Sequence, residues 1–260
     1  MPGDASQGCQ RGVADWAGNI VAFVLVITAN AMANIVPLGG KTTGEVSALY
    51  PSLFTPAGFT FGIWALIYSA LTLFIVYQAL PGQHGNERIA RISGWFKVNC
   101  AGNALWIFAW HYDFIWMSLA LMLVILATLL LMYRSLAIVD RSAPLAERCL
   151  LQFPISLYTG WISVALIANI SAVQTAMDWN NVGLDAITWT LLKIAVAAVV
   201  ASTVITQRRD RVFVLVIAWA AYGISVGQAA TPAVAGAATL AMMFGVLLVL
   251  LETGRRLRSR

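Results

Sequence analysis

Long apolar runs follow one another along the chain with only short polar interruptions between them. Each run is continuous rather than alternating between apolar and polar positions, which favours membrane helices over the strands of a membrane β-barrel. Because a bilayer core requires about 20 apolar residues per helix, we predict an all-α polytopic membrane helix bundle with about eight transmembrane helices. The predicted helices cover residues 17–36, 58–80, 95–110, 115–133, 150–173, 186–205, 212–229 and 234–252.

The composition indicates a protein of the bilayer, because 60% of the 260 residues are hydrophobic and only 10% are charged. The net charge of +5 comes from basic residues scattered over short loops and a short C-terminal tail. Such scattered charges do not form the folded basic domain that a nucleic-acid interface needs. The expected partners are therefore membrane lipid and a small molecule, and no nucleic acid.

The distribution of Lys and Arg predicts the orientation of the chain, since short cytoplasmic loops collect basic residues and exported loops do not. Thirteen basic residues fall in one set of predicted loops and tails, and Lys41 alone falls in the other. Both ends are therefore predicted to be cytoplasmic, in a multi-pass protein of the bacterial inner membrane. Arg11 followed by an apolar run also fits a cleavable signal peptide, but we favour a retained helix because the run is long.

Cysteine usage points to no further class of protein. Cys9, Cys100 and Cys149 fall in the N-terminal tail, within a helix and at a cytoplasmic helix end. None of them faces an oxidising compartment, so no disulfide framework is predicted. The sequence shows no spacing of metal ligands either, so we predict no metal site.

Composition divides the chain near residue 180. Residues 1–180 hold five predicted helices and eight of the ten Trp, whereas residues 181–260 hold three helices rich in Ala, Val and Gly and a basic tail. We therefore predict two structural units, a five-helix bundle over residues 1–180 and three additional transmembrane helices with the tail over residues 181–260. In the second unit, Gly223 and Gly227 have the spacing of small residues that lets membrane helices pack closely.

The longest exported connection, residues 37–57, contains Gly-Gly, Tyr-Pro and Thr-Pro pairs. These are turn-forming and interfacial residues, so we predict a non-helical segment that is long enough to fold over the bundle. The exported connections at 111–114 and 230–232 are only a few residues long, which predicts an antiparallel helical hairpin around each.

One stripe of polar and aromatic residues runs along the third predicted helix. Its members are Asn99, Asn103, Trp106 and Trp110. Polar side chains are unfavourable against lipid, so this stripe is predicted to face the interior of the bundle. Two interpretations stay open for Asn103 and Trp106, namely hydrogen bonding between helices and contact with a ligand. Trp110 is predicted to be an aromatic anchor at the exported interface.

Two other helices contribute similar residues. Trp64 and Tyr68 lie one turn apart in the second predicted helix. Trp161 and Asn169 lie close to one face of the fifth. Such a set suits a flat, largely apolar ligand, because indole rings stack on it while amides and a hydroxyl fix its orientation. The alternative is the ordinary packing of a Trp-rich membrane protein.

In their order, these residues form motifs. The chain has Thr-Pro-x-Gly-x-x-Phe-Gly from residue 55 followed by a Trp and a Tyr, Asn-x-x-Trp from residue 103, and Trp-Ile-Ser-x-Ala-x-x-x-Asn from residue 161. This series resembles the corresponding helices of the translocator protein family, also called tryptophan-rich sensory proteins or peripheral benzodiazepine receptors. The resemblance covers residues 17 to about 180 and assigns no role to the last three helices.

The resemblance implies a five-helix bundle with a ligand pocket under the 37–57 loop as a lid, binding porphyrins and other hydrophobic compounds, with sterol in some members. The step from Gly62 to Trp64 is one residue shorter than in the family pattern, which leaves the facing of Trp64 open by about 100°. Beyond a porphyrin or other tetrapyrrole bound as ligand, no cofactor is implied. Carried over by motif, the ligand-binding residues are Trp64, Tyr68, Asn103, Trp106, Trp161 and Asn169.

Lys193 lies well inside the sixth predicted helix, and an intramembrane charge is a functional candidate by default. We favour a structural interpretation in which it extends towards Asp185 near the exported surface; a lysine that binds a chromophore covalently is the alternative. His111 and Asp113 flank Tyr112 in a tight turn, where they need not converge as an acid–base pair. We therefore predict no catalytic residues.

The leading hypothesis is a membrane receptor or binding protein for a hydrophobic, tetrapyrrole-like small molecule, which it senses or transports. The alternatives are a secondary transporter or permease for a small hydrophobic substrate, an assembly factor and a membrane enzyme. The sequence is also compatible with a homodimer.

Overall fold

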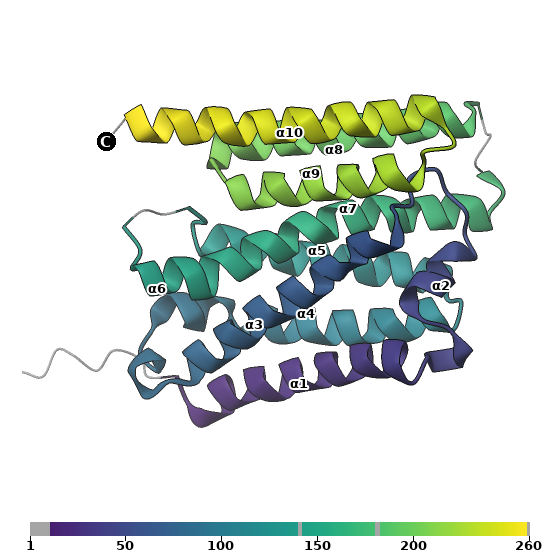
Figure 1. The fold of residues 1–260 in the computed structure, drawn as a ribbon. Coiled ribbons are helices and arrows are strands. Elements are labelled where there is room, and N and C mark those ends of the chain that lie inside the picture. The colour runs from purple at the N-terminus through teal and green to yellow at the C-terminus, as the bar shows by residue number, and fades with distance from the viewer. Residues whose placement is uncertain (1–10, 140–141, 180–182, 259–260) are drawn as a thin grey trace, which may run out of the picture.

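The computed structural model describes residues 11–139, 142–179 and 183–258. Within these ranges the protein is helical and has no β-strand, and eight long helices lie side by side in one bundle (Figure 1). The predicted fold class, an all-α polytopic membrane bundle, is confirmed. The long helices are α1 (Val13–Ile35), α3 (Ile63–Ala79), α4 (Glu87–His111), α5 (Ile115–Ser135), α7 (Phe153–Ala176), α8 (Ala186–Arg208), α9 (Arg211–Gly227) and α10 (Pro232–Arg258).

Six of the described helical segments are long and apolar enough to cross a membrane, so the chain is an integral multi-pass membrane protein. The two remaining long helices differ from these for separate reasons. α4 has 25 residues but includes four charged ones, and α9 has only 17 residues. At 1.5 Å per residue, α9 spans about 25 Å against a bilayer core of about 30 Å. The count of eight crossings therefore stays a prediction.

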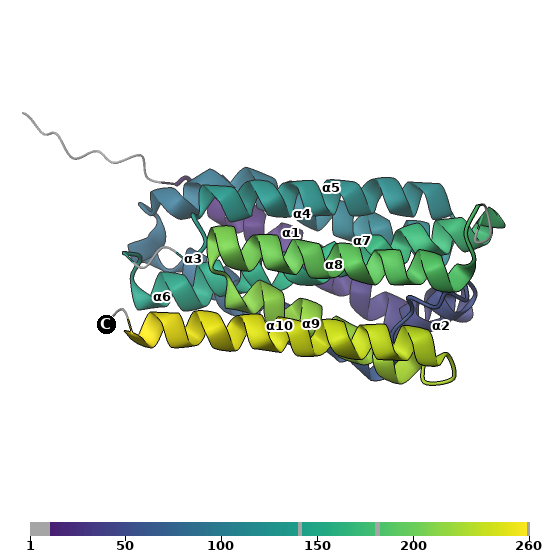
Figure 2. The same cartoon turned by 90° about the horizontal axis from the view of Figure 1, so that it is seen from above.

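Both ends of the described chain lie at one end of the bundle, where α1 begins and α10 ends (Figures 1 and 2). An even number of crossings requires this arrangement. We call this end the basic end, because Arg88 and Arg91 at the start of α4, Arg148 after α5 and Arg209 between α8 and α9 lie there. We call the opposite end the lid end. The cytoplasmic placement of the basic end stays a prediction from the loop charges.

The long helices pack largely in chain order. α4 lies between α1 and α5, α5 packs on α7, and α7 packs on α9, which contacts both α8 and α10 (Figure 1). α7 is therefore enclosed from two sides. Gly160 permits its close approach to α9, because a Cβ at this position would lie 3.1 Å from Cβ of Val216.

The connection between α1 and α3, which we call the lid, is more regular than predicted. It contains the short helix α2 (Thr43–Ala48), where we predicted none. The prediction was wrong because Thr42 and Glu45 form a capping box: Oγ1 of Thr42 accepts from the Glu45 N–H, and Oε2 of Glu45 accepts from the Thr42 N–H at 2.7 Å. The other short segments are the 3₁₀ turns η1 (Leu38–Gly40), η2 (Gly58–Gly62) and η3 (Pro81–Gln83), the turn α6 (Leu145–Glu147) and the π-helical turn Arg148–Gln152.

Near the basic end, α9 is joined to the first five long helices by Asp210, a buried carboxylate. Its Oδ1 caps α9 by accepting from the backbone N–H groups of Val212 at 3.0 Å and Phe213 at 3.2 Å. Its Oδ2 accepts from the hydroxyls of Tyr133 in α5 at 2.8 Å and Ser156 in α7 at 2.5 Å. One side chain thus connects three helices.

At the lid end, α9 packs against η2 and the residues before it. The Ala57 N–H donates to the Gly223 carbonyl at 2.9 Å, and Nε1 of Trp219 donates to the Thr60 carbonyl at 3.1 Å. A Cβ at Gly227 would lie 2.7 Å from the Ala57 nitrogen. The close packing predicted at Gly223 and Gly227 is confirmed, although the partner is the segment 55–62, which we call the base of the lid, rather than another long helix.

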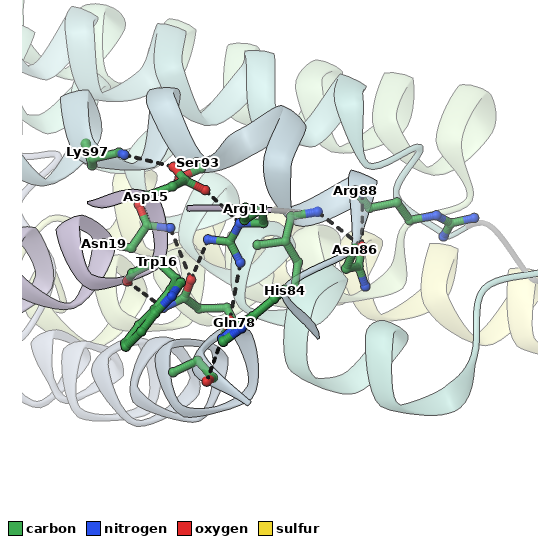
Figure 3. A network of polar contacts seen from close by, with 12 residues as sticks. Arg11, Asp15, Trp16, Asn19, Gln78, His84, Asn86, Arg88, Ser93 and Lys97 are labelled. Atoms are coloured by element: carbon green, nitrogen blue, oxygen red, sulfur yellow. Dashed lines mark hydrogen bonds and ion pairs between the residues drawn. The ribbon is translucent and has the colours of Figure 1, made fainter. Parts of the chain in front are cut away.

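A polar network ties α1, α3 and α4 together at the basic end (Figure 3). Nη2 of Arg11 donates to Oε1 of Gln78 at 2.6 Å, and Nε pairs with Asp15 at 2.7 Å. Oδ1 of Asp15 accepts from Nζ of Lys97 at 2.9 Å and from the Ser93 hydroxyl. The charge of Lys97, which lies inside α4, is therefore paired with a carboxylate of α1.

Candidate functional site

A cavity lies at the lid end between α3, α4, α5 and α7, and the lid covers it. Two kinds of lid residue line the cavity. Thr43 and Ser47 belong to α2, and Thr55 and Pro56 belong to the segment that leads to η2. Five of the six residues predicted to bind a ligand line this cavity, namely Trp64, Asn103, Trp106, Trp161 and Asn169. The motifs on three separate helices thus converge on one space, while their contact with a ligand stays a prediction.

Aromatic rings form much of the cavity wall. The ring centroids of Trp64 and Trp161 are 6.3 Å apart with an interplanar angle of 83°. Phe61 also meets Trp161 edge to face, at 6.1 Å. Trp106 stacks on Trp110 with centroids 5.5 Å apart. Such faces and edges suit a flat aromatic molecule.

Trp64 faces the cavity despite the shortened spacing of its motif. The turn that precedes it, η2, is a 3₁₀ helix with about 3.0 residues per turn, so each of its residues rotates the chain by about 120° rather than the 100° of an α-helix. This rotation contributes to the direction in which Trp64 leaves α3. The side chain stacks on Tyr68 with centroids 5.2 Å apart.

The two predicted amides are hydrogen-bonded to neighbouring helices. Nδ2 of Asn103 donates to the Tyr158 hydroxyl at 2.5 Å, and Oδ1 accepts from Nδ2 of Asn30 at 3.0 Å. Nδ2 of Asn169 donates to the Ser118 hydroxyl at 3.2 Å. Asn103 therefore joins helices α1, α4 and α7 while its side chain also lines the cavity.

Two indole donors of the cavity wall remain unused. The indole Nε1–H groups of Trp106 and Trp161 are buried and make no hydrogen bond with any residue that the structure describes. A buried donor without an acceptor is unfavourable by about 1–3 kcal/mol. Both side chains line the cavity, so a ligand that presents acceptors to these N–H groups would remove this penalty.

Tyr68, the sixth predicted residue, lies outside the cavity. It lines an adjoining groove of about 710 Å³ between α1, α3 and the lid. Phe61, Trp64 and Trp106 line both spaces and form their common wall. On the α1 side the groove includes Ile35, whose side chain is exposed at the surface of the bundle.

The cavity is nearly filled by its own side chains. Its free volume is about 70 Å³, room for a few water molecules. Pockets that hold drug-sized ligands measure about 300–1,000 Å³. A ligand of that size therefore requires the aromatic wall or the lid to move, and movement of the wall would join the cavity to the groove.

One member of the polar stripe, Trp110, lies elsewhere than predicted, whereas Asn99 faces inwards as predicted. Trp110, predicted to be an interfacial anchor, is instead buried under the lid, where its Nε1 donates to the Thr43 carbonyl at 3.3 Å. That prediction was wrong because the lid extends over this part of α4 and covers Trp110. Asn99 does face inwards, but it bonds to Thr128 of α5 at 2.9 Å and does not line the cavity.

Two further aromatic residues near the site, Tyr158 and the lid residue Tyr50, were not predicted from the sequence. Tyr158 lies three residues before Trp161 on the same helix face, and this spacing could have revealed it. Its ring meets Trp64 at 5.9 Å. Tyr50 packs on Trp110, also at 5.9 Å, from an irregular segment that carries no periodic signal.

The lid helix is expected to weaken in acid. Hydrogen bonds from the backbone N–H and the hydroxyl of Thr42 lower the pKa of Glu45 from its usual 4.5. Because the folded-state pKa is depressed, this stabilisation is present above the unfolded-state pKa and is lost as the pH falls through the folded-state value. Amide exchange over Thr43–Ala48, corrected for its intrinsic pH dependence, should therefore speed up in acid.

Glu45→Ala supplies the matched variant for this prediction, because it removes both the charge and the acceptor, whereas a Gln could still accept from the Thr42 N–H. It should exchange faster than the wild type at neutral pH and show no acid transition in the lid. An unchanged exchange rate at neutral pH would show that the capping box does not hold α2.

A sequence model of the family described as TSPO-like protein matches residues 15–251. The chain belongs to this family. The resemblance seen in the Trp and Asn motifs is confirmed, and the family match continues past residue 180 through α8 and α9 into α10. No curated protein and no solved structure matches the chain.

Membership of the TSPO-like family makes the protein a membrane-bound protein of the TSPO binding and sensing type. The family match includes α9, which holds the base of the lid. The last three helices therefore lie within or extend from the matched region, and one of them, α9, contacts the lid segment that lines the cavity.

Proposed function

We propose that the protein is a receptor that binds a flat, hydrophobic, tetrapyrrole-like molecule in the cavity beneath the lid. The observation that carries the proposal is the pair of buried, unpartnered indole N–H groups of Trp106 and Trp161 in a largely aromatic wall. A tetrapyrrole offers π faces to the rings and polar edges to the two donors. Binding would give the N–H groups of Trp106 and Trp161 the hydrogen-bond acceptors that they lack.

The groove at Tyr68 supports access from the side of the bundle. It shares a wall with the cavity and reaches exposed Ile35 on α1. A hydrophobic ligand dissolved in the bilayer could then reach the site once Trp64 or Trp106 changes rotamer. We also propose that the lid faces the exported side, in a bacterial inner membrane, as the loop charges predict.

Transport is the alternative function, and the basic end favours binding over it. The network around Arg11, Asp15 and Gln78 fills the space between α1, α3 and α4 with paired polar groups. A translocation path through the bundle would have to break these buried hydrogen bonds. Release of porphyrin across proteoliposomes that contain the protein would nevertheless support the transporter.

Titration with protoporphyrin IX tests the receptor. Trp fluorescence should be quenched saturably, and the fitted Kd should rise in Trp106→Phe and Trp161→Phe, which keep an aromatic ring but remove the N–H. Each lost hydrogen bond should weaken binding by about three- to tenfold. Trp161→Ala, which also removes the wall, should weaken it more.

Trp95→Phe is the matched control, because Trp95 lies on α4 but is exposed on the outside of the bundle. Its Kd should equal that of the wild type although its quenching amplitude changes. Absence of saturable quenching, or equal Kd values in all variants, would contradict the proposed site.

A further inference from the structure

A second cavity lies at the lid end, between the lid, the first two turns of α8 and the turn after α9. Its volume is about 390 Å³, within the range of small-molecule pockets. Pro51 and Leu53 of the lid contribute apolar surface, and Trp189 and Lys193 project from α8. This space therefore combines an apolar wall with a cation.

Lys193 is half-buried in this cavity and makes no ion pair or hydrogen bond with any described residue. Asp185, the expected partner, is used elsewhere: its two carboxylate oxygens accept from the N–H and the hydroxyl of Thr188 at 2.8 and 3.0 Å. By contrast, Lys97 inside α4 is paired with Asp15. The structural interpretation of Lys193 as a partner of Asp185 is therefore not realised.

A second donor in the same cavity is also unused. Nε1 of Trp189 is buried and has no hydrogen-bond partner within the described ranges. Trp189 and Lys193 are four residues apart and so lie on the same face of α8. An ammonium and an N–H donor without acceptors, in one partly buried cavity, together favour an anionic acceptor.

We propose that this cavity binds the anionic head, a carboxylate or a phosphate, of an amphipathic molecule. Nζ of Lys193 is the counter-ion, and Nε1 of Trp189 is the second donor. The apolar part of the molecule packs against Pro51 and Leu53. This site is separate from the aromatic cavity, and it stands whether or not that cavity binds a tetrapyrrole.

The two cavities are nonetheless neighbours, because Ser47 and Thr55 of the lid line both. Gln228, which also lines the second cavity, donates through Nε2 to the Thr55 carbonyl at 2.9 Å. A molecule held at Lys193 therefore contacts the same lid segment that covers the aromatic cavity. Its occupancy would favour the closed lid.

Isothermal titration of the full chain in nanodiscs of zwitterionic phosphatidylcholine tests this site. The probes are indole-3-propionate, its uncharged amide and phenyl phosphate. We expect at least one of the two anions to bind saturably. The amide should bind at least about tenfold more weakly than indole-3-propionate, since it cannot form the charged hydrogen bond to Lys193. Lys193→Met should lose the same factor, and Lys193→Arg should restore binding.

Lys41→Met is the control, because Lys41 is an exposed cation at the same end of the bundle; it should leave binding unchanged. Circular dichroism and gel filtration confirm that each variant is folded. A lack of saturable binding by both anions, equal binding of acid and amide, or a wild-type Kd in Lys193→Met would overturn the proposal.

Anionic phosphatidylglycerol in the nanodiscs identifies the source of the anion. If a lipid head fills the cavity, the apparent affinity of the soluble anion should fall several-fold in these discs for the wild type but not for Lys193→Met. If the natural ligand is a soluble acid, the affinity should not depend on the lipid.

Discussion

Asp210→Ala is expected to lower the free energy of unfolding by about 3 kcal/mol, because it removes a helix cap and two hydrogen bonds to a buried carboxylate. The hydroxyls of Tyr133 and Ser156 would lose their acceptor where α5, α7 and α9 meet. Reversible unfolding in mixed micelles, with increasing dodecyl sulfate, measures this loss.

The control for this prediction is Asp185→Ala. Asp185 caps α8 as Asp210 caps α9, but it is exposed and bonds only within its own helix. It should destabilise the protein much less. Equal effects of the two substitutions would mean that the bonds from Asp210 to α5 and α7 contribute nothing.

Gly227→Val is expected to detach α9 from the base of the lid. A Cβ there would lie 2.7 Å from the Ala57 nitrogen, which is backbone and cannot rotate away as a side chain can. We expect a loss of about 2 kcal/mol from overpacking. The Ala57 N–H, which donates to Gly223, should also lose its protection against hydrogen exchange as α9 shifts.

Gly236→Val is the matched control, because a Cβ at Gly236 in α10 would meet nothing within 4 Å. It should leave both the stability and the exchange at Ala57 close to the wild-type values. Retained protection at Ala57 in Gly227→Val would show that the lid base does not depend on α9.

Helical periodicity was enough to predict much of the fold and most of the aromatic cavity. Asn103 and Trp161 lie on regular helices, where spacing fixes the direction of a side chain. Helix ends were less predictable, because apolar runs report only the apolar part of a helix. α4 begins at Glu87 rather than at residue 95, since Asn86 caps a polar first turn through its side-chain oxygen.

What the sequence did not reveal depends on contacts between distant parts of the chain. Asp210 bonds to residues 77 and 54 positions earlier, and no local pattern relates them. The lid helix is a different case, since the Thr42–Glu45 capping box was present in the sequence. The proline and glycine pairs around it obscured that signal.

The position of α9 has a consequence for biogenesis. A ribosome releases α7 well before Asp210 and α9, so the Gly160 face of α7 first meets lipid or the insertion machinery instead of its final neighbour. Likewise, the base of the lid cannot form its hydrogen bond from Ala57 until Gly223 has been synthesised. A nascent chain that stops near residue 180 holds every candidate residue for the tetrapyrrole, yet it lacks the helix that fixes their cover. If the cavity binds a ligand as proposed, competence to bind is acquired late, when the last third of the chain has been inserted.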